Sequence, residues 1–486
     1  MNHETVFSLE CRPAPPSRNS SWVIGCGCLA NGVARPRFKS TPPRSNLVAP
    51  RFAVLFSLLF VLLLVYDGAH AQKWVNPQFD THRLDLRDLG YPDATAIDAD
   101  NCPITALVTG ANGRVYGATS GKASCLFLYD RSINKVRPLG RIGDALGCYH
   151  ALVQDDDGTL YVGGGLNMLA PVPLTQQFPG GFRAIEEQLW KDITAPYADY
   201  AGGRLYHYDA AQHDADTRMP NAPCPLEDLG VPVRGNTIYA LSIDTRRRKL
   251  YGLSYPDARF FVWDLEKKQV LDVGPVVEHK VYSGPERTWR SIPRALYIAA
   301  DGQVYTSGDD GRIVVYDPRT QQLRRTTMQI PGEYWEAWNY YGYPVLEQWV
   351  ADTKGRVFGT TSDGFLFEMD VEQKRVVNLG KPRVARRVRA MTLGPDERLY
   401  LICGEFQDVC KLYSYDLTGR EGFRDWGVLA VDRSPYYAKR AYQFDAMATG
   451  VDGTIFMGES DRRASLFLFI PGGEGFPGGF NPSNPR

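Results

Sequence analysis

The sequence lacks a net charge, because 55 lysines and arginines are balanced by 55 aspartates and glutamates over 486 residues. Proteins that bind nucleic acid or membrane surfaces usually carry a basic excess, so this balance argues against both kinds of partner. Several enzyme motifs are also missing. The chain has no P-loop or GxGxxG for nucleotides, no GxSxG for a serine hydrolase and no CxxC for a zinc ribbon.

Long apolar runs are scarce, and the exception lies near the N-terminus, at residues 52–66 (FAVLFSLLFVLLLVY). This run is shorter than the roughly 20 residues of a membrane span. An Ala-His-Ala cleavage pattern follows at 69–71, so we expect a secretory signal peptide cut before Gln72, with residues 1–71 removed. The mature protein would then be secreted or periplasmic, with no stable membrane span. A retained N-terminal anchor and a translation start near Val48 stay open as alternatives.

Cysteine is sparse but informative, because export permits disulfides. Six cysteines would remain after cleavage: Cys102, Cys125, Cys148, Cys224, Cys403 and Cys410. Cys403 and Cys410 flank a short loop between two strand patterns, so we expect them to form a bridge across a hairpin. The other four can pair in three ways, and the sequence does not choose among them.

What the sequence has in abundance is a repeated unit of four short strands, found seven times after residue 100. Examples of its first half are HALVQDDDGTLYVGG (150–164) and RALYIAADGQVYTSG (294–308), and many units close on Leu-Gly or Val-Gly, as in VRPLG and VVNLG. Such a unit buries both faces only by stacking against its neighbours around an axis. The repeat therefore predicts an all-β fold, a seven-bladed β-propeller of four-stranded blades.

The seventh unit lacks its closing strand, since the chain continues into a flexible Gly/Pro-rich tail at 472–486. The segment THRLDLRDLG (81–90) carries the closing pattern, so we expect this N-terminal strand to complete the last blade and close the ring. The propeller would span residues 72–471. A long insertion at 165–203, which includes the helical pattern FRAIEEQLWKDI, interrupts the second blade and is expected to be a surface loop.

One position of the aligned units breaks the apolar pattern in all seven. It starts the innermost strand, so these side chains should surround one mouth of the central channel: Thr105, His150, Tyr239, Arg294, Glu347, Arg389 and Asp445. One interpretation is a solvated rim whose mixed charges satisfy one another. The other is a ligand-binding or catalytic site, which is supported by the aromatic and basic loops expected at the same mouth, including Trp335 and Trp338.

A histidine, a tyrosine and several arginines around one pocket suit β-elimination on a uronate. Arginines neutralise the substrate carboxylate and so acidify the C5 proton, a neutral histidine removes that proton, and a tyrosine protonates the leaving O4 oxygen. This hypothesis makes His150 the base, with Tyr149 as a substitute, and Tyr239 the acid. Arg294 and Arg389 would hold the carboxylate, with Arg234 or Arg440 assisting. The implied partner is an acidic oligo- or polysaccharide.

In this plan the chain resembles the β-propeller polysaccharide lyases, which act on oligogalacturonate, ulvan or rhamnose–glucuronate linkages. The resemblance covers residues 81–471 by architecture and rests, at the site, on His150, Tyr239, Arg294 and Arg389. It implies a carbon–oxygen lyase. Some of these families use a metal; the sequence itself requires no cofactor, presents no convincing ligand set, and leaves a structural metal open.

Two alternatives stand beside the lyase. Glu347 and Asp445 lie on the same ring, and two carboxylates could serve a glycoside hydrolase. A non-catalytic propeller that binds glycan or protein through its aromatic loops is the third hypothesis, because propellers carry many unrelated functions.

Overall fold

The chain divides into two compact units, Met1–Trp74 and Val75–Arg486, and the described residues all lie in the second. The computed structural model describes residues 97–98, 100–110, 113–130, 135–167, 194–216, 218–277, 292–308, 311–332, 344–383, 388–405, 408–434, 437–440, 443–460 and 464–471.

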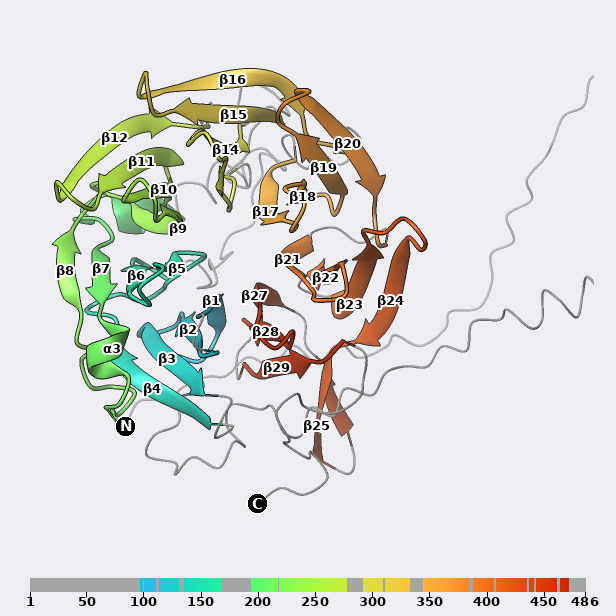
Figure 1. The fold of residues 1–486 in the computed structure, drawn as a ribbon. Helices are drawn as coiled ribbons and strands as arrows, with labels where there is room; N and C mark the ends of the chain where they lie inside the picture. Colours follow the sequence, from blue (N-terminus) through green and yellow to red (C-terminus); the bar gives the residue numbers. More distant parts are fainter. Residues whose placement is uncertain are drawn as a thin grey trace, which may run out of the picture. The chain divides into compact units, whose positions relative to one another are not determined.

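These residues form a ring of antiparallel blades (Figure 1). Six blades show four strands each: β1–β4 (Ile104–Thr109, Val115–Thr119, Cys125–Asp130, Lys135–Arg141), β5–β8 (Leu152–Gln154, Leu160–Gly163, Leu205–Tyr208, Glu227–Gly230), β9–β12 (Thr237–Asp244, Lys249–Tyr255, Arg259–Asp264, Gln269–Pro275), β13–β16 (Tyr297–Ile298, Val304–Ser307, Arg312–Asp317, Gln322–Gln329), β17–β20 (Leu346–Ala351, Val357–Thr361, Leu366–Asp370, Arg375–Gly380) and β21–β24 (Val388–Leu393, Arg398–Glu405, Asp408–Asp416, Phe423–Val428). The seventh blade shows β27–β29 (Phe444–Thr449, Ile455–Glu459, Leu466–Phe469), and a separate hairpin, β25–β26 (Ala430–Ser434, Tyr437–Arg440), precedes it.

This arrangement confirms the predicted seven-bladed propeller. The first and last blades meet, because the Thr109 hydroxyl donates to the Thr449 carbonyl oxygen at 2.9 Å and the Ala464 N–H contacts the Cys102 sulfur at 3.1 Å. The strand expected at 81–90, which would complete the last blade, lies outside the described residues and stays a prediction.

Position within a blade explains the composition of its strands. Second strands such as β2 and β18 are buried along their whole length, because both faces pack on neighbouring blades, whereas the outermost strand β12 is largely exposed. The closing Leu-Gly pattern also has a backbone reason. Gly140 and Gly380 adopt positive φ, of 114° and 97°, where each closing strand is bulged, and only glycine adopts this conformation without strain.

The expected disulfide between Cys403 and Cys410 is wrong, and the six cysteines that the structure describes form no disulfide. The register places Cys403 opposite Lys411, so Cys410 is offset by one residue and its side chain points to the other face of the blade. Accordingly, Cys403 packs in the core on one face with Leu401 and Tyr413, and Cys410 packs in the core on the other face.

Residues 165–167 and 194–203 of the insertion are described, and the second of these segments contains a 3-10 helix, η3 (Ala195–Tyr197). A short helix, α3 (Ala210–His213), follows β7. The expected helical segment at 182–193 lies outside the described residues. None of the helices in the described ranges has the length and apolar character needed to cross a membrane.

Candidate functional site

A β-bulge marks the polar position of the repeat. In five blades the register between the first and second strands skips one residue, and the skipped residue is the polar one in each case: Thr105, Tyr239, Glu347, Arg389 and Asp445. A bulge adds a residue to one strand and re-aims its side chain. The bulge therefore explains how a polar residue interrupts an apolar strand. Because Tyr239 is the bulged residue of its blade, the structure supports its equivalence to the polar residues of the other repeats.

In the other two blades the polar residue stands just before the inner strand. His150 precedes β5 with a φ of 30°, an uncommon value for a residue other than glycine. Its N–H donates to the Thr105 carbonyl oxygen at 3.2 Å, and its carbonyl oxygen accepts from Leu241 N–H at 3.0 Å, so three blades meet at this backbone. Arg294 precedes β13 and donates its N–H to the Leu346 carbonyl oxygen at 2.9 Å.

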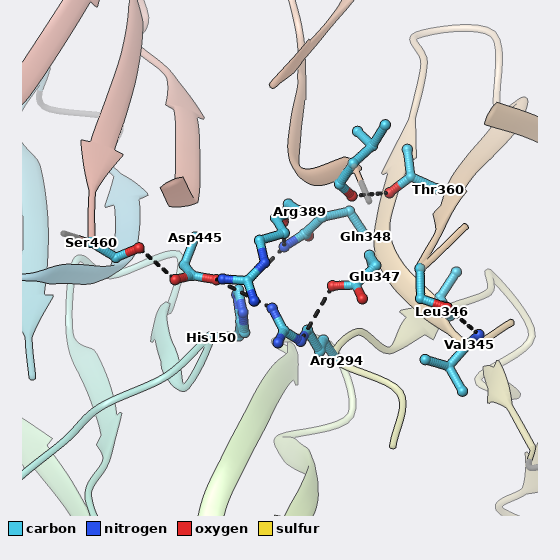
Figure 2. Close-up of polar contacts among 12 residues, drawn as sticks. His150, Arg294, Val345, Leu346, Glu347, Gln348, Thr360, Arg389, Asp445 and Ser460 are labelled. Atoms are coloured by element: carbon cyan, nitrogen blue, oxygen red, sulfur yellow. Dashed lines mark hydrogen bonds and ion pairs between the residues drawn. The ribbon is translucent and has the colours of Figure 1, made fainter. Parts of the chain in front are cut away.

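Four of these side chains form an ion-pair network near the axis (Figure 2). Asp445 Oδ1 accepts from Arg389 Nη1 at 3.0 Å and from Arg294 Nη1 at 3.2 Å, while Arg294 Nε lies 3.2 Å from Glu347 Oε2. The Ser460 hydroxyl donates to the second oxygen of Asp445 at 2.6 Å. Two positive and two negative groups thus match one another. We call His150, Arg294, Glu347, Arg389 and Asp445 the axial cluster.

The charged side chains of this cluster are mostly buried, and their burial and mutual charges shift their pKa values. The side chains of Glu347 and Asp445 are 0% and 3% exposed, and those of Arg294 and Arg389 are 12% and 14% exposed. Burial alone would raise the pKa of Asp445, but Arg389 and Arg294 hold it well below its usual range. Burial would likewise lower the pKa of Arg294, but Glu347, Tyr239 and Asp445 raise it above its ordinary value.

His150 is neutral in this setting. Burial and the charge of Arg294 lower its pKa to about 4, although Asp445 and Glu347 act in the opposite direction. Its ring meets the ring of Tyr239 edge-on, with centroids 6.4 Å apart, and the Arg294 guanidinium lies 5.9 Å from the centre of the Tyr239 ring. His150 and Tyr239 are therefore neighbours beside a cationic group.

Of the other expected site residues, the structure describes the side chains of Tyr149 and Arg234. Tyr149 is buried in the core with its ring centre 6.5 Å from that of Tyr239, and its hydroxyl donates to Asn167 Oδ1 at 2.9 Å. Arg234 is exposed in the turn before β9. Arg440 ends β26, but its side chain is not described, and Trp335 and Trp338 lie outside the described residues.

Two amides and one hydroxyl that contact the axial cluster were not predicted from the sequence, because they do not stand at an equivalent position of the repeated unit. They belong to Gln348, Gln443 and Ser460. Gln348 contacts His150 Nδ1 and the Arg389 carbonyl oxygen, both at 3.4 Å. Gln443 donates to Asp445 Oδ2 at 3.1 Å, beside Ser460. The available signals were weak: Gln348 directly follows Glu347 of the ring, and Ser460 directly follows strand β28.

The cluster offers little to a metal or to a hydrolase. Within the described ranges, no group of three or more His, Cys, Asp or Glu side chains could hold a metal ion. A hydrolase needs one carboxylate of its pair protonated, whereas Arg294 contacts both Glu347 and Asp445, and the pKa of Asp445 is lowered. The geometry does not favour that alternative.

A hollow of about 380 Å³ lies next to the axial cluster, further along the same inner strands. Leu152, Leu296 and Trp349, which line it, each stand two residues beyond a cluster residue. Its lining is mostly apolar and contains no lysine, arginine, aspartate or glutamate. The charged side chains of the axial cluster and this apolar hollow are therefore only two residues apart along the chain at each of these three positions.

Neither any protein-family model nor any curated protein matches the chain. Solved structures similar to it include streptogramin B lyase (TM-score 0.49, 9% identity, 76% of this chain and 94% of that one) and virginiamycin B lyase from Staphylococcus aureus (0.49, 9%, 77% and 96%). The WD40 β-propeller domain of Doa1 is another (0.44, 11%, 75% and 93%). This likeness extends to the fold alone, and the resemblance to polysaccharide lyases is likewise supported only for the propeller architecture.

Proposed function

We propose that this protein is a secreted lyase that cleaves uronate-containing polysaccharides by β-elimination at the axial cluster. The observation that carries the proposal is a neutral imidazole, His150, packed against Tyr239 beside the Arg294 guanidinium. Elimination requires proton transfer at C5 and O4 and a positive environment for the carboxylate, whose negative charge grows in the transition state. His150 and Tyr239 would contact the substrate.

In this proposal Arg294 and Arg389 do not bind the substrate carboxylate alone. Arg294 and Arg389 already bind Asp445, so a substrate carboxylate would share them with that residue. Because the fork of an arginine carries five donors, one guanidinium can serve more than one acceptor. In this proposal Asp445 holds both forks in place and the substrate completes the network.

A non-catalytic propeller that binds acidic glycans is the second candidate. One observation favours it: the two arginines and two carboxylates of the cluster are matched within the protein, as in a network that only stabilises the channel. Such a protein would retain glycan without changing it.

One experiment separates the two candidates. Purified protein is incubated with oligogalacturonate, ulvan and rhamnose–glucuronate polymers while ultraviolet absorbance follows the conjugated unsaturated uronate. We expect absorbance to rise with at least one polymer, and His150→Ala to lower the rate about 100-fold or more. His207→Ala, which alters a partly exposed histidine beside Glu227 in another part of the propeller, is the matched control and should keep full activity.

No absorbance with any polymer, together with retardation of the protein in a glycan affinity gel, would favour the binding candidate. The export part of the proposal is tested separately. N-terminal sequencing of the protein recovered outside the cytoplasm should begin at Gln72, and an intact N-terminus there would contradict signal cleavage.

A further inference from the structure

The contacts of the Gln348 side chain indicate which ring nitrogen of His150 carries the proton. One atom, Gln348 Nε2, makes both of the contacts at 3.4 Å, to the Arg389 carbonyl oxygen and to His150 Nδ1. A carbonyl oxygen can only accept a hydrogen bond, so the amide must present its NH₂ group to it. The same NH₂ group then faces Nδ1, and Nδ1 is the acceptor (Figure 2).

This arrangement selects one tautomer of the imidazole. A neutral histidine carries one ring proton, and the partner of one nitrogen determines which nitrogen holds it. Because His150 is neutral at physiological pH and its Nδ1 accepts, its proton is on Nε2. The nitrogen that remains available to a ligand is therefore a donor and has no lone pair with which to take a proton.

We propose that His150 binds the substrate carboxylate as a neutral hydrogen-bond donor through Nε2, and that Gln348 is the positioning residue that sets this tautomer. The inference rests on the proposed lyase function and changes the role of His150 within it. A donor of this kind fits the site, since the charges of Arg294 and Arg389 are already matched by the cluster carboxylates. It strengthens as negative charge develops on the carboxylate.

Tyr239 is then the neighbouring group that handles the proton. In this proposal the Tyr239 hydroxyl first gives its proton to solvent. The resulting phenolate oxygen takes the C5 proton, the C5–H electron pair forms the C4–C5 double bond, and the C4–O4 pair leaves with O4. The leaving oxygen takes the proton back from the Tyr239 hydroxyl, so the phenolate is regenerated and no co-reactant is consumed. The Arg294 guanidinium lies 5.9 Å from the centre of the Tyr239 ring, beside this proton transfer.

Two substitutions of His150 distinguish a donor from a base. Glutamine places an amide N–H near the position of Nε2 but cannot act as a base, whereas alanine supplies neither function. We expect His150→Gln to keep ultraviolet-detected activity within about 10-fold of the wild type, while His150→Ala loses about 100-fold or more, the usual cost of losing a transition-state donor. Equal loss in both variants overturns the inference.

Nitrogen-15 NMR of the imidazole tests the tautomer without reference to activity. The His150 signals, assigned by their absence in His150→Gln, should show a protonated Nε2 and an unprotonated Nδ1. In Gln348→Glu the carboxylate accepts instead of donating, so the proton should move to Nδ1. A wild-type proton on Nδ1 overturns the inference. If Nε2 carries the proton but no polymer is cleaved, the lyase proposal fails while the tautomer assignment is supported.

Discussion

Asp445 shows how a single residue organises the axial cluster. It is the second residue of β27, the inner strand of the last blade, and it accepts hydrogen bonds from Arg294 of the fourth blade and Arg389 of the sixth. Ser460 and Gln443 satisfy its other oxygen. A buried carboxylate with four donors and a lowered pKa stays ionised, so its charge is a fixed part of the site.

Replacing Asp445 with asparagine should therefore be costly. The substitution keeps the size of the side chain and removes the charge shared by two buried arginines, so we expect the free energy of unfolding to fall by about 3–5 kcal/mol. Urea denaturation measures the loss. Asp156→Asn, in an exposed turn, is the control and should change stability by less than about 0.5 kcal/mol. Equal stability of the two variants would show that the network contributes nothing.

His150 predicts a dependence of stability on pH. Its pKa falls from 6.5 to about 4 on folding, so between these values the unfolded chain binds a proton that the native protein does not. The contribution is fully present above pH 6.5 and is lost as the pH falls toward 4, by a total on the order of 3 kcal/mol. Urea denaturation at about pH 7 and about pH 5 should show a smaller loss for His150→Gln than for the wild type. Parallel losses would mean that His150 titrates normally.

At the level of the strand, three blades share a packing feature besides the bulge. A glycine in the second strand lies directly opposite a phenylalanine in the third, which leaves room for the ring. The pairs are Gly117 with Phe127, Gly252 with Phe261, and Gly359 with Phe367. A Cβ atom built at Gly252 would lie 2.2 Å from Cζ of Phe261, so this glycine is required by packing.

Gly252→Ala should destabilise the protein by about 1–3 kcal/mol, because the added methyl group overpacks the blade. Thermal denaturation measures the effect. In Gly252→Ala/Phe261→Leu the smaller side chain leaves room for the methyl group, so part of the loss should return. Gly422→Ala, where no atom lies within 4 Å of the added Cβ, is the matched control and should be nearly neutral. An unchanged melting temperature in Gly252→Ala would contradict the packing argument.

For the whole molecule, the ring must close between its first and last blades. The described contacts join β1 to β27 through Thr109 and Thr449, but the last blade shows three strands. The repeat predicts residues 81–90 as the fourth strand. Closure by a strand from the other end of the chain would tie the two ends of the propeller together.

Two truncations test this closure. Removing residues 1–71 deletes the expected signal peptide and should leave the melting temperature unchanged. Removing residues 1–90 also deletes the expected closing strand, so we expect a melting temperature lower by about 1–3 °C, as a loss of about 1–2 kcal/mol would produce in a chain of this size. Equal melting temperatures for the two truncated proteins would exclude 81–90 as a structural strand.

Much of the fold could be predicted because its signals are local. The turns with Asp-Gly, the Leu-Tyr strands and the Leu-Gly endings each reflect a few neighbouring residues, and the repetition of one unit sets the number of blades. The disulfide failed for a reason that spacing could not reveal. Cys403 and Cys410 flank a hairpin, but a register offset by one residue sends their side chains to opposite faces.

The sequence by itself determined the propeller and the one position, filled by residues such as His150 and Asp445, where every unit departs from the apolar pattern. Only the tertiary structure decided that Arg294 meets Glu347 and Asp445, that Gln348 faces His150, and that Arg234 is exposed. The physical reason is distance along the chain. Strand and turn propensities act over a few residues, whereas an ion pair between Arg294 and Asp445, 151 residues apart, exists only after the ring has brought separate blades to one axis.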